Sequence, residues 1–184
     1  MRSATSLIPA EAPIVRPVYY EKLDYEVELR TIIGPGGRHI KSANALGHVF
    51  GDTLFNDASM RDFRRRTAQW TPGKNFDARG PTGPTVVTPH ELPTGALELQ
   101  LDARLNGQVR QAATTPDMLF KIPYTLEMLC EYCTLEAGNI IAMGAPEGVG
   151  HARKPAVRMK PEDLVEVEIE GVGICHRPVF AEVL

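Results

Sequence analysis

Two acidic side chains at alternate positions form the most chemically suggestive pattern in the sequence. Acidic and apolar residues alternate over residues 24–29, so Glu26 and Glu28 are expected on one face of a strand, with Val27 and Leu29 on the other. Two carboxylates held side by side repel each other, and a cation is the usual remedy. The alternative is an edge strand whose acidic residues face solvent, which is the commoner role of such alternation.

A second polar stretch, residues 55–77, is predicted to contain a helix followed by a loop. Asn56 or Asp57 can accept hydrogen bonds from the free amides of a first helical turn, and good helix formers continue to about Ala68. The loop that follows carries a single lysine, Lys74. Asp57 is therefore either a helix cap or a functional carboxylate, and Lys74 is either a surface lysine or a functional cation.

Length and charge narrow the class of partner. A chain of 184 residues with 43% hydrophobic content can bury a core, and one domain is the expected number. The net charge of -3 and the pI near 6.0 give no general attraction for nucleic acid or acidic membranes, which favours a small-molecule ligand. The first 17 residues contain only a broken apolar run, and no stretch has membrane-spanning length. A cytoplasmic protein is expected.

The cysteines indicate reduced thiols. There are three, an odd number in a chain without an export signal. Cys130 and Cys133 have the spacing of a metal or redox pair, but they lie in a predicted amphipathic helix without a second pair of ligands. We interpret them as small buried or half-buried residues.

Hydrophobic periodicity predicts more strand than helix. A lead-in arm is expected over residues 1–17, with one extended piece at 13–16, and a single domain over 18–184. Asn106-Gly107 predicts a hairpin, and the glycine and proline run 80–84 predicts an irregular loop. The other elements expected are a helical turn at 41–46, a helix at 123–133, and strands at 25–33, 48–54, 86–88, 97–104, 108–113, 140–144, 164–170 and 174–183. The expected class is α+β, mainly β, with two short helices and with sheets rolled or packed against each other.

Six blocks, in order along the chain, resemble the fumarylacetoacetate hydrolase superfamily. They run over residues 24–29, 56–62, 69–77, 80–84, 106–111 and 160–173. The similarity extends from about Ser3 to the end of the chain, and an ordered set of blocks is more specific than any single one. The resemblance implies a mixed β-sandwich roll that is usually dimeric, so a homodimer with an apolar interface is expected.

The resemblance also implies roles for individual residues. The carboxylates that match the family's ligands for Mg²⁺ or Mn²⁺ are Glu26, Glu28 and Asp57. Lys74 matches the lysine of the catalytic site, Arg61 an arginine on the substrate side, and Thr115 a threonine that contacts the substrate. Arg64, Arg65 and Arg66 are interpreted as a solvated helix face.

The implied activity is metal-dependent chemistry on small 2-oxo or β-diketo acids, by hydrolysis, decarboxylation, hydration or isomerisation. A divalent ion would stabilise an enolate of such a substrate. Lys74 would hold an oxyanion or polarise the distal carbonyl, and Arg61 would clamp a carboxylate.

The sequence departs from the family pattern at a catalytic feature. Hydrolases of the family use a His-x-x-Glu pair on an amino-terminal lid, and none of the five histidines is followed three positions later by glutamate. The chain is expected to begin after that lid. Segments 114–117 and 143–146 and the arginine at position 64 also differ from the family pattern. Two alternatives therefore stand beside an active enzyme: a catalytically silent dimer partner or binding subunit, and a fragment of a longer enzyme.

Overall fold

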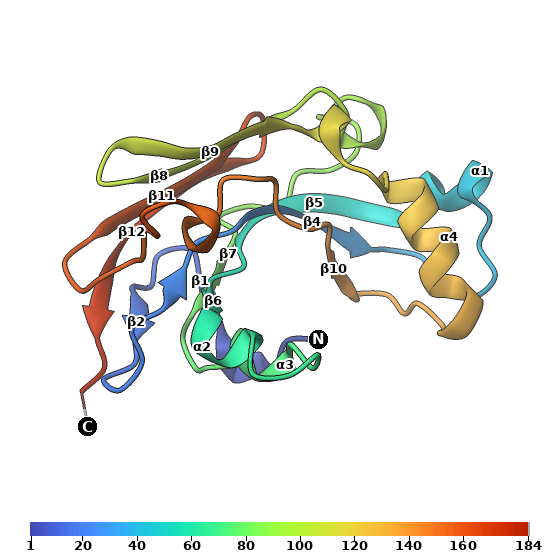
Figure 1. The fold of residues 1–184 in the computed structure, drawn as a ribbon. Helices are drawn as coiled ribbons and strands as arrows, with labels where there is room; N and C mark the ends of the chain where they lie inside the picture. Colours follow the sequence, from blue (N-terminus) through green and yellow to red (C-terminus); the bar gives the residue numbers. More distant parts are fainter. Residues whose placement is uncertain (184) are drawn as a thin grey trace.

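Two five-stranded sheets form the body of the protein in a computed structural model, which describes residues 1–183 (Figure 1). The first sheet contains, in spatial order, β1 (Leu7–Pro9), β7 (Gly80–Thr82), β5 (Val49–Asn56), β4 (Val27–Ile33) and β10 (Ile140–Ala142). The second contains β2 (Ile14–Arg16), β12 (Gly173–Ala181), β11 (Leu164–Ile169), β8 (Gln100–Leu105) and β9 (Gln108–Thr114). A small sheet pairs β3 (Leu23–Asp24) with β6 (Ser59–Met60). The expected mainly-β α+β class is confirmed.

The helices are short and lie at the margins of the sheets. Over residues 1–183 there are four rather than the two expected: α1 (Ser42–Ala45), α2 (Arg61–Arg64), α3 (Thr71–Lys74) and α4 (Ile122–Tyr132). Figure 1 shows α1 and α4 together at one end of the molecule, whereas α2 and α3 lie beside the amino terminus. No helix over residues 1–183 is long and apolar enough to cross a membrane.

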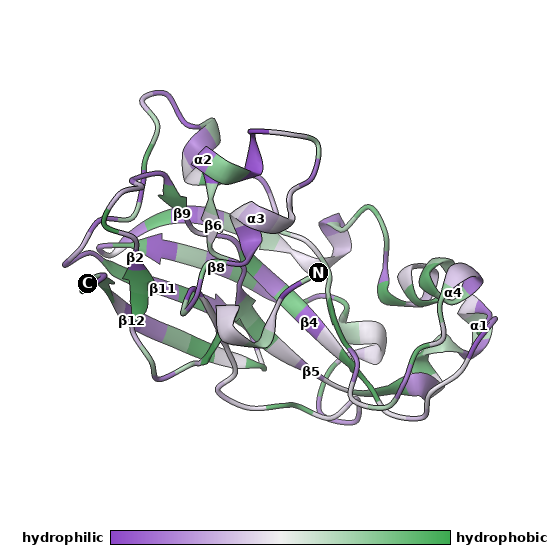
Figure 2. Cartoon of the chain, turned by 90° about the horizontal axis from the view of Figure 1, so that it is seen from below, coloured by the Kyte–Doolittle hydropathy of each residue, from purple (hydrophilic) through white to green (hydrophobic). Residues whose placement is uncertain are grey.

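The core lies between the two large sheets. Alternate residues of β8 and β11 are buried, including Leu101, Ala103, Val165 and Val167, as expected when one face of each strand packs inward. Hydrophobic and hydrophilic residues are accordingly interspersed along the strands (Figure 2). The expectation for the cysteine pair is confirmed: both thiols are free, with Cys130 buried and Cys133 half-buried.

The helix predicted after Asp57 was wrong over most of its length. Only residues 61–64 form it, as α2, because β6 comes first and pairs with β3 through Leu23 and Met60. The amide of Asp57 donates to the carbonyl of Glu26 at 2.8 Å, so this residue continues strand pairing and does not cap a helix. Tertiary pairing here outweighs the local helix propensity.

Residues 80–84 were also predicted wrongly, as an irregular loop. Three of them form β7, which pairs with β1 in parallel and with β5 in antiparallel register. Pro81 has no amide hydrogen to donate, but backbone amides on either side of it form hydrogen bonds to the neighbouring segments. The amide of Arg79 donates to the carbonyl of Ser6 at 3.2 Å, and that of Gly83 donates to the carbonyl of Leu54 at 3.0 Å.

Other expectations were met in part. The hairpin at Asn106-Gly107 is confirmed and joins β8 to β9. The strand predicted at 86–88 is a single bridge between Val87 and Asp52. Residues 140–144 were expected to form a buried strand, but β10 is an edge strand on which Ile140 is 49% exposed. In the expected arm, β1 joins the first sheet and β2 the second.

Candidate metal centre and active site

Three carboxylates meet at one end of the first sheet. One oxygen each from Glu26, Glu28 and Asp57 lies within 4.8 Å of the other two, and all three residues are buried. Since β4 lies between β5 and β10, the edge-strand reading of the two glutamates is excluded. The structure thus brings together the three predicted metal ligands, with an all-oxygen donor set that suits a hard cation.

Backbone pairing fixes the positions of these carboxylates. Glu26 immediately precedes β4, and Asp57 immediately follows β5, the antiparallel neighbour of β4. The amide of Glu26 donates to the side-chain oxygen of Asn56 at 3.0 Å. Together with the bond from the Asp57 amide to the Glu26 carbonyl, this contact holds the two segments in one register. Glu26 and Asp57, 31 positions apart in sequence, therefore present their carboxylates at one point.

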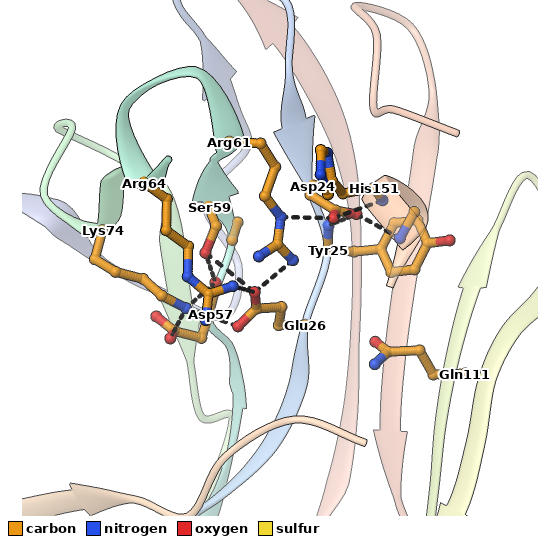
Figure 3. Close-up of polar contacts among 12 residues, drawn as sticks. Asp24, Tyr25, Glu26, Asp57, Ser59, Arg61, Arg64, Lys74, Gln111 and His151 are labelled. Atoms are coloured by element: carbon orange, nitrogen blue, oxygen red, sulfur yellow. Dashed lines mark hydrogen bonds and ion pairs between the residues drawn. The ribbon is translucent and has the colours of Figure 1, made fainter. Parts of the chain in front are cut away.

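Lys74 is the cation of this cluster. Its Nζ donates to Glu26 Oε2 at 2.7 Å and to Asp57 Oδ2, as Figure 3 shows. Lys74 ends α3, and the preceding Gly73 allows α3 to approach α2: a Cβ at this glycine would lie 2.6 Å from the backbone nitrogen of Arg64. The reading of Lys74 as an unengaged surface lysine is therefore excluded.

Asp57 has two cationic partners. Arg2 donates from Nε to Asp57 Oδ1 at 2.7 Å and from Nη2 to the carbonyl of Ala58 at 2.8 Å. Burial by itself would raise the pKa of Asp57, but the charges and hydrogen bonds of Lys74 and Arg2 hold that pKa below its ordinary value. Asp57 is thus an anion at neutral pH. Sequence reasoning assigned no role to Arg2, because its distance of 55 residues from Asp57 hides the contact.

Glu28 is in a different electrostatic position. Burial and the negative charges of Asp57 and Glu26 together raise its pKa to about 8, against the opposing influence of Lys74. Its carboxylate is therefore the member of the cluster whose charge is least compensated. A bound divalent cation would supply the missing compensation.

A second ion-pair layer lies behind Glu26. Arg61 is 5% exposed, with its Nε 2.8 Å from Asp24 Oδ2 and its Nη2 2.5 Å from Glu26 Oε1. Asp24 also accepts from the amides of Gly150 at 2.8 Å and His151 at 2.9 Å (Figure 3). Arg61, expected to clamp a substrate, is here engaged by two protein carboxylates. Asp24 was part of a matched block, yet its role in holding Arg61 had no signal in the sequence.

Arg64 differs from its neighbours Arg65 and Arg66, which are exposed as expected. Its Nη1 lies 3.1 Å from Glu26 Oε1, and its guanidinium stacks 4.7 Å from the centre of the Trp70 ring. The interpretation of Arg64 as part of a solvated face was therefore wrong. The short α2 turns this side chain inward while the next two residues leave the helix.

Thr115 lies away from the carboxylates. It is buried where β9 ends, and its Oγ1 accepts a hydrogen bond from the amide of Leu99 at 3.1 Å. It is not among the residues that line the cavities at the cluster. The structure thus brings five of the six predicted site residues together and places the sixth in a backbone contact at another part of the sheets.

Two adjoining cavities open onto the carboxylates. One, of about 510 Å³, is lined by all three and by the 144–147 segment after β10. The other, of about 590 Å³, is lined by Asp57 and Lys74 together with Arg2, Arg30 and Phe55. Trp70 and Ala142 border both. A small acid entering either cavity would meet Lys74 and at least one of the three carboxylates.

Comparison with known proteins agrees with this arrangement. The family model for the fumarylacetoacetate (FAA) hydrolase C-terminal domain matches residues 1–180. A fumarylacetoacetate hydrolase from Exiguobacterium antarcticum superimposes with a TM-score of 0.93 at 38% identity, over 98% of this chain and 65% of that one. A 5-carboxymethyl-2-hydroxymuconate delta-isomerase from Mycobacterium smegmatis gives 0.88 at 32% identity, over 98% and 67%.

The human protein named oxaloacetate tautomerase FAHD2B, mitochondrial, is 38% identical over 173 residues. That alignment covers 93% of this chain and 55% of the human protein. The chain therefore spans about half the length of this curated relative.

Proposed function

Because the chain belongs to the fumarylacetoacetate hydrolase C-terminal family, we propose that it is a divalent-metal-dependent enzyme acting on small 2-oxo or β-diketo acids. The observation that carries this proposal is the buried triad of Glu26, Glu28 and Asp57 beside Lys74. Burying three carboxylates is costly without compensating cations, and a cavity next to them gives a substrate access.

Mg²⁺ or Mn²⁺ is the proposed ion. Glu26, Glu28 and Asp57 would hold it, since hard divalent cations prefer oxygen ligands and leave positions for water and substrate oxygens. When bound, such an ion supplies positive charge at the place where negative charge develops on a 2-oxo acid. The raised pKa of Glu28 indicates that its ionised form lacks a sufficient cationic partner among the protein groups, which supports the fit.

The chain's own groups would orient the substrate and handle charge. The Lys74 ammonium faces the cavity and can donate to a developing enolate oxygen. Arg64, stacked on Trp70 at the rim, is placed to pair with a substrate carboxylate. Arg61 would act as a positioning residue, since its pairs with Asp24 and Glu26 hold the latter carboxylate in place.

Among the reactions of this class, keto–enol tautomerisation or decarboxylation of a small 2-oxo acid such as oxaloacetate is proposed over hydrolysis. Both need an electron sink but no activated water. The names of the human tautomerase and of the mycobacterial isomerase support an isomerising chemistry.

The test is the conversion of oxaloacetate between its enol and keto forms, followed by ultraviolet absorbance with Mg²⁺ or with a chelator. The wild-type chain is expected to accelerate it only with the metal, and Lys74→Met to lose about 10²- to 10⁴-fold in rate. Equal rates for wild type, variant and buffer would refute the proposal.

A catalytically silent dimer partner is the second candidate. The contacts of Arg2 and Lys74 with Asp57 favour it, because two protein cations already compensate part of the carboxylate charge. In that case Mg²⁺ would neither bind tightly nor support turnover.

We also propose a cytoplasmic location for this chain, although the human relative is named as mitochondrial.

A further inference from the structure

Arg30 extends the functional face of β4 beyond the carboxylates. Side chains at alternate positions of a strand share a face, so Arg30 continues the row begun by Glu26 and Glu28. On the neighbouring strand β10 the residue paired with Arg30 is Ala142, whose small side chain leaves space above the arginine. Arg30, at the end of this row, lines the same cavity as Asp57 and Lys74.

The guanidinium of Arg30 is buried without its full set of partners. Arg30 is 3% exposed, and its Nε and Nη1 have no hydrogen-bond partner among the described residues. The group stacks on the ring of Phe55, 3.2 Å from the ring centre. A guanidinium stays charged at neutral pH. A buried charge with free donors is costly unless an anion meets it.

Two neighbouring arginines show why Arg30 stands apart. Arg2 borders the same cavity but already donates to Asp57 and to the carbonyl of Ala58. Arg79 is also buried, with Nε and Nη1 lacking partners and with Phe76 beneath it at 5.2 Å, but it borders neither cavity at the cluster. Arg30 combines unpaired donors with a position on the cavity wall.

We propose that Arg30 binds the distal carboxylate of a dicarboxylic 2-oxo acid whose 2-oxo acid end lies at Glu26, Glu28 and Asp57. This inference rests on the proposed function and adds the residue that selects dicarboxylic over monocarboxylic 2-oxo acids. The Cα atoms of Glu28 and Arg30, two positions apart on a strand, are separated by roughly 6.6 Å, which matches the length of a four- or five-carbon diacid. A guanidinium can hold a carboxylate through two parallel hydrogen bonds.

The experiment uses Trp70, the single tryptophan of the chain, which borders both cavities and reports binding through its fluorescence. Mg²⁺-loaded protein is titrated with oxaloacetate and with 2-oxobutanoate, four-carbon acids that differ in the distal carboxylate. Wild type is expected to bind the diacid at least about tenfold more tightly. Arg30→Met is expected to weaken diacid binding about 10- to 100-fold and to change monoacid binding less than about twofold.

Arg79→Met is the matched control, since it removes a comparable buried arginine and should leave both affinities unchanged. Arg30→Lys should retain part of the preference for the diacid. If Arg30→Met does not fold, the wild-type preference decides, and equal affinities for the two acids overturn the inference. Equal weakening of both acids by Arg30→Met, or none, also overturns it while leaving the proposed function standing. If wild type binds neither acid, the proposed function fails as well.

Discussion

At the scale of single residues, Glu28 is the carboxylate on which metal affinity should depend most. Replacing it with Gln keeps its size but removes one of three anionic ligands, so Mg²⁺ affinity measured by calorimetry is expected to fall at least about tenfold. The metal-free variant should unfold at the same or a higher temperature, because an amide of the same size cannot ionise and so avoids like-charge repulsion with Asp57 and Glu26. Glu170→Gln, in the exposed turn that follows β11, serves as the control. Unchanged affinity in Glu28→Gln would remove this residue from the site.

Asp52 allows a pH prediction that is independent of the metal centre. Burial raises its pKa to about 6, against the lowering effect of a hydrogen bond from Thr31 at 2.6 Å. Between pH 4 and 6 the folded chain then keeps a proton that the unfolded chain releases, so this residue's contribution to stability declines as pH rises through that range. The free energy of unfolding of Asp52→Asn, relative to that of wild type, should therefore rise by about 3 kcal/mol or less between pH 4 and pH 7. Urea unfolding at both pH values measures the gain, and a difference that does not vary with pH would contradict the assignment.

At the scale of elements, the contact between α2 and α3 sets the position of Lys74. A Cβ on Gly73 would meet backbone atoms of Arg64 at 2.6 and 2.7 Å, so Gly73→Ala must push the two helices apart. The expected cost is about 1–3 kcal/mol of stability, together with a loss of oxaloacetate turnover as Lys74 moves from the carboxylates. Gly47→Ala is the control, since nothing lies within 4 Å of its added Cβ. Equal effects of the two variants would show that the helix contact does not position the lysine.

Sequence reasoning predicted the elements best where the pattern was local. The alternation of β8 and β11 and the turn at Asn106-Gly107 depend on residues close together in the chain, and the structure confirms them. The segment after Asp57 was predicted wrongly because its conformation depends on β3, more than 30 residues earlier. Residues 80–82 likewise become a strand only through their distant partners β1 and β5.

The site divides in the same way. Glu26, Glu28, Asp57 and Lys74 could be placed from family motifs, which preserve residue type and spacing. Arg2 and Arg30 could not be assigned, because their roles depend on the positions that their guanidinium groups take beside the cavity in the folded chain. A buried arginine leaves no periodic or motif pattern that would distinguish it from an exposed one.

At the scale of the whole molecule, an exposed apolar stripe supports the expected homodimer. Tyr124, Met128 and Tyr132 follow one another at helical spacing on α4 and are 46%, 41% and 70% exposed, and Leu119 and Phe120 nearby are 92% and 59% exposed. Light scattering at micromolar concentration should give twice the chain mass. Met128→Glu combined with Tyr132→Glu should shift the protein toward monomer. A wild-type monomer would refute the expectation, and a dimer that survives both changes would place its interface elsewhere.

The reaction preference is also a property of the whole cavity. Hydrolysis of an acylpyruvate needs a general base to activate water, and among residues 1–183 no histidine lines either cavity at the carboxylates. Loss of a positioned base typically removes about 10²- to 10⁴-fold in rate. Decarboxylation of oxaloacetate needs only stabilisation of the enolate, which the cationic Lys74 can assist. Tautomerisation needs in addition a proton transfer between C3 and the enol oxygen, but no activated water.

Parallel assays of oxaloacetate and acetylpyruvate with Mg²⁺ should therefore show faster conversion of oxaloacetate. Asp57→Asn and Lys74→Met should both abolish the difference, because each removes a group of the cluster on which enolate stabilisation depends. Faster cleavage of acetylpyruvate would mean that another group supplies the base. If neither substrate turns over, the carboxylates serve binding or assembly, and the silent dimer partner becomes the better description of this chain.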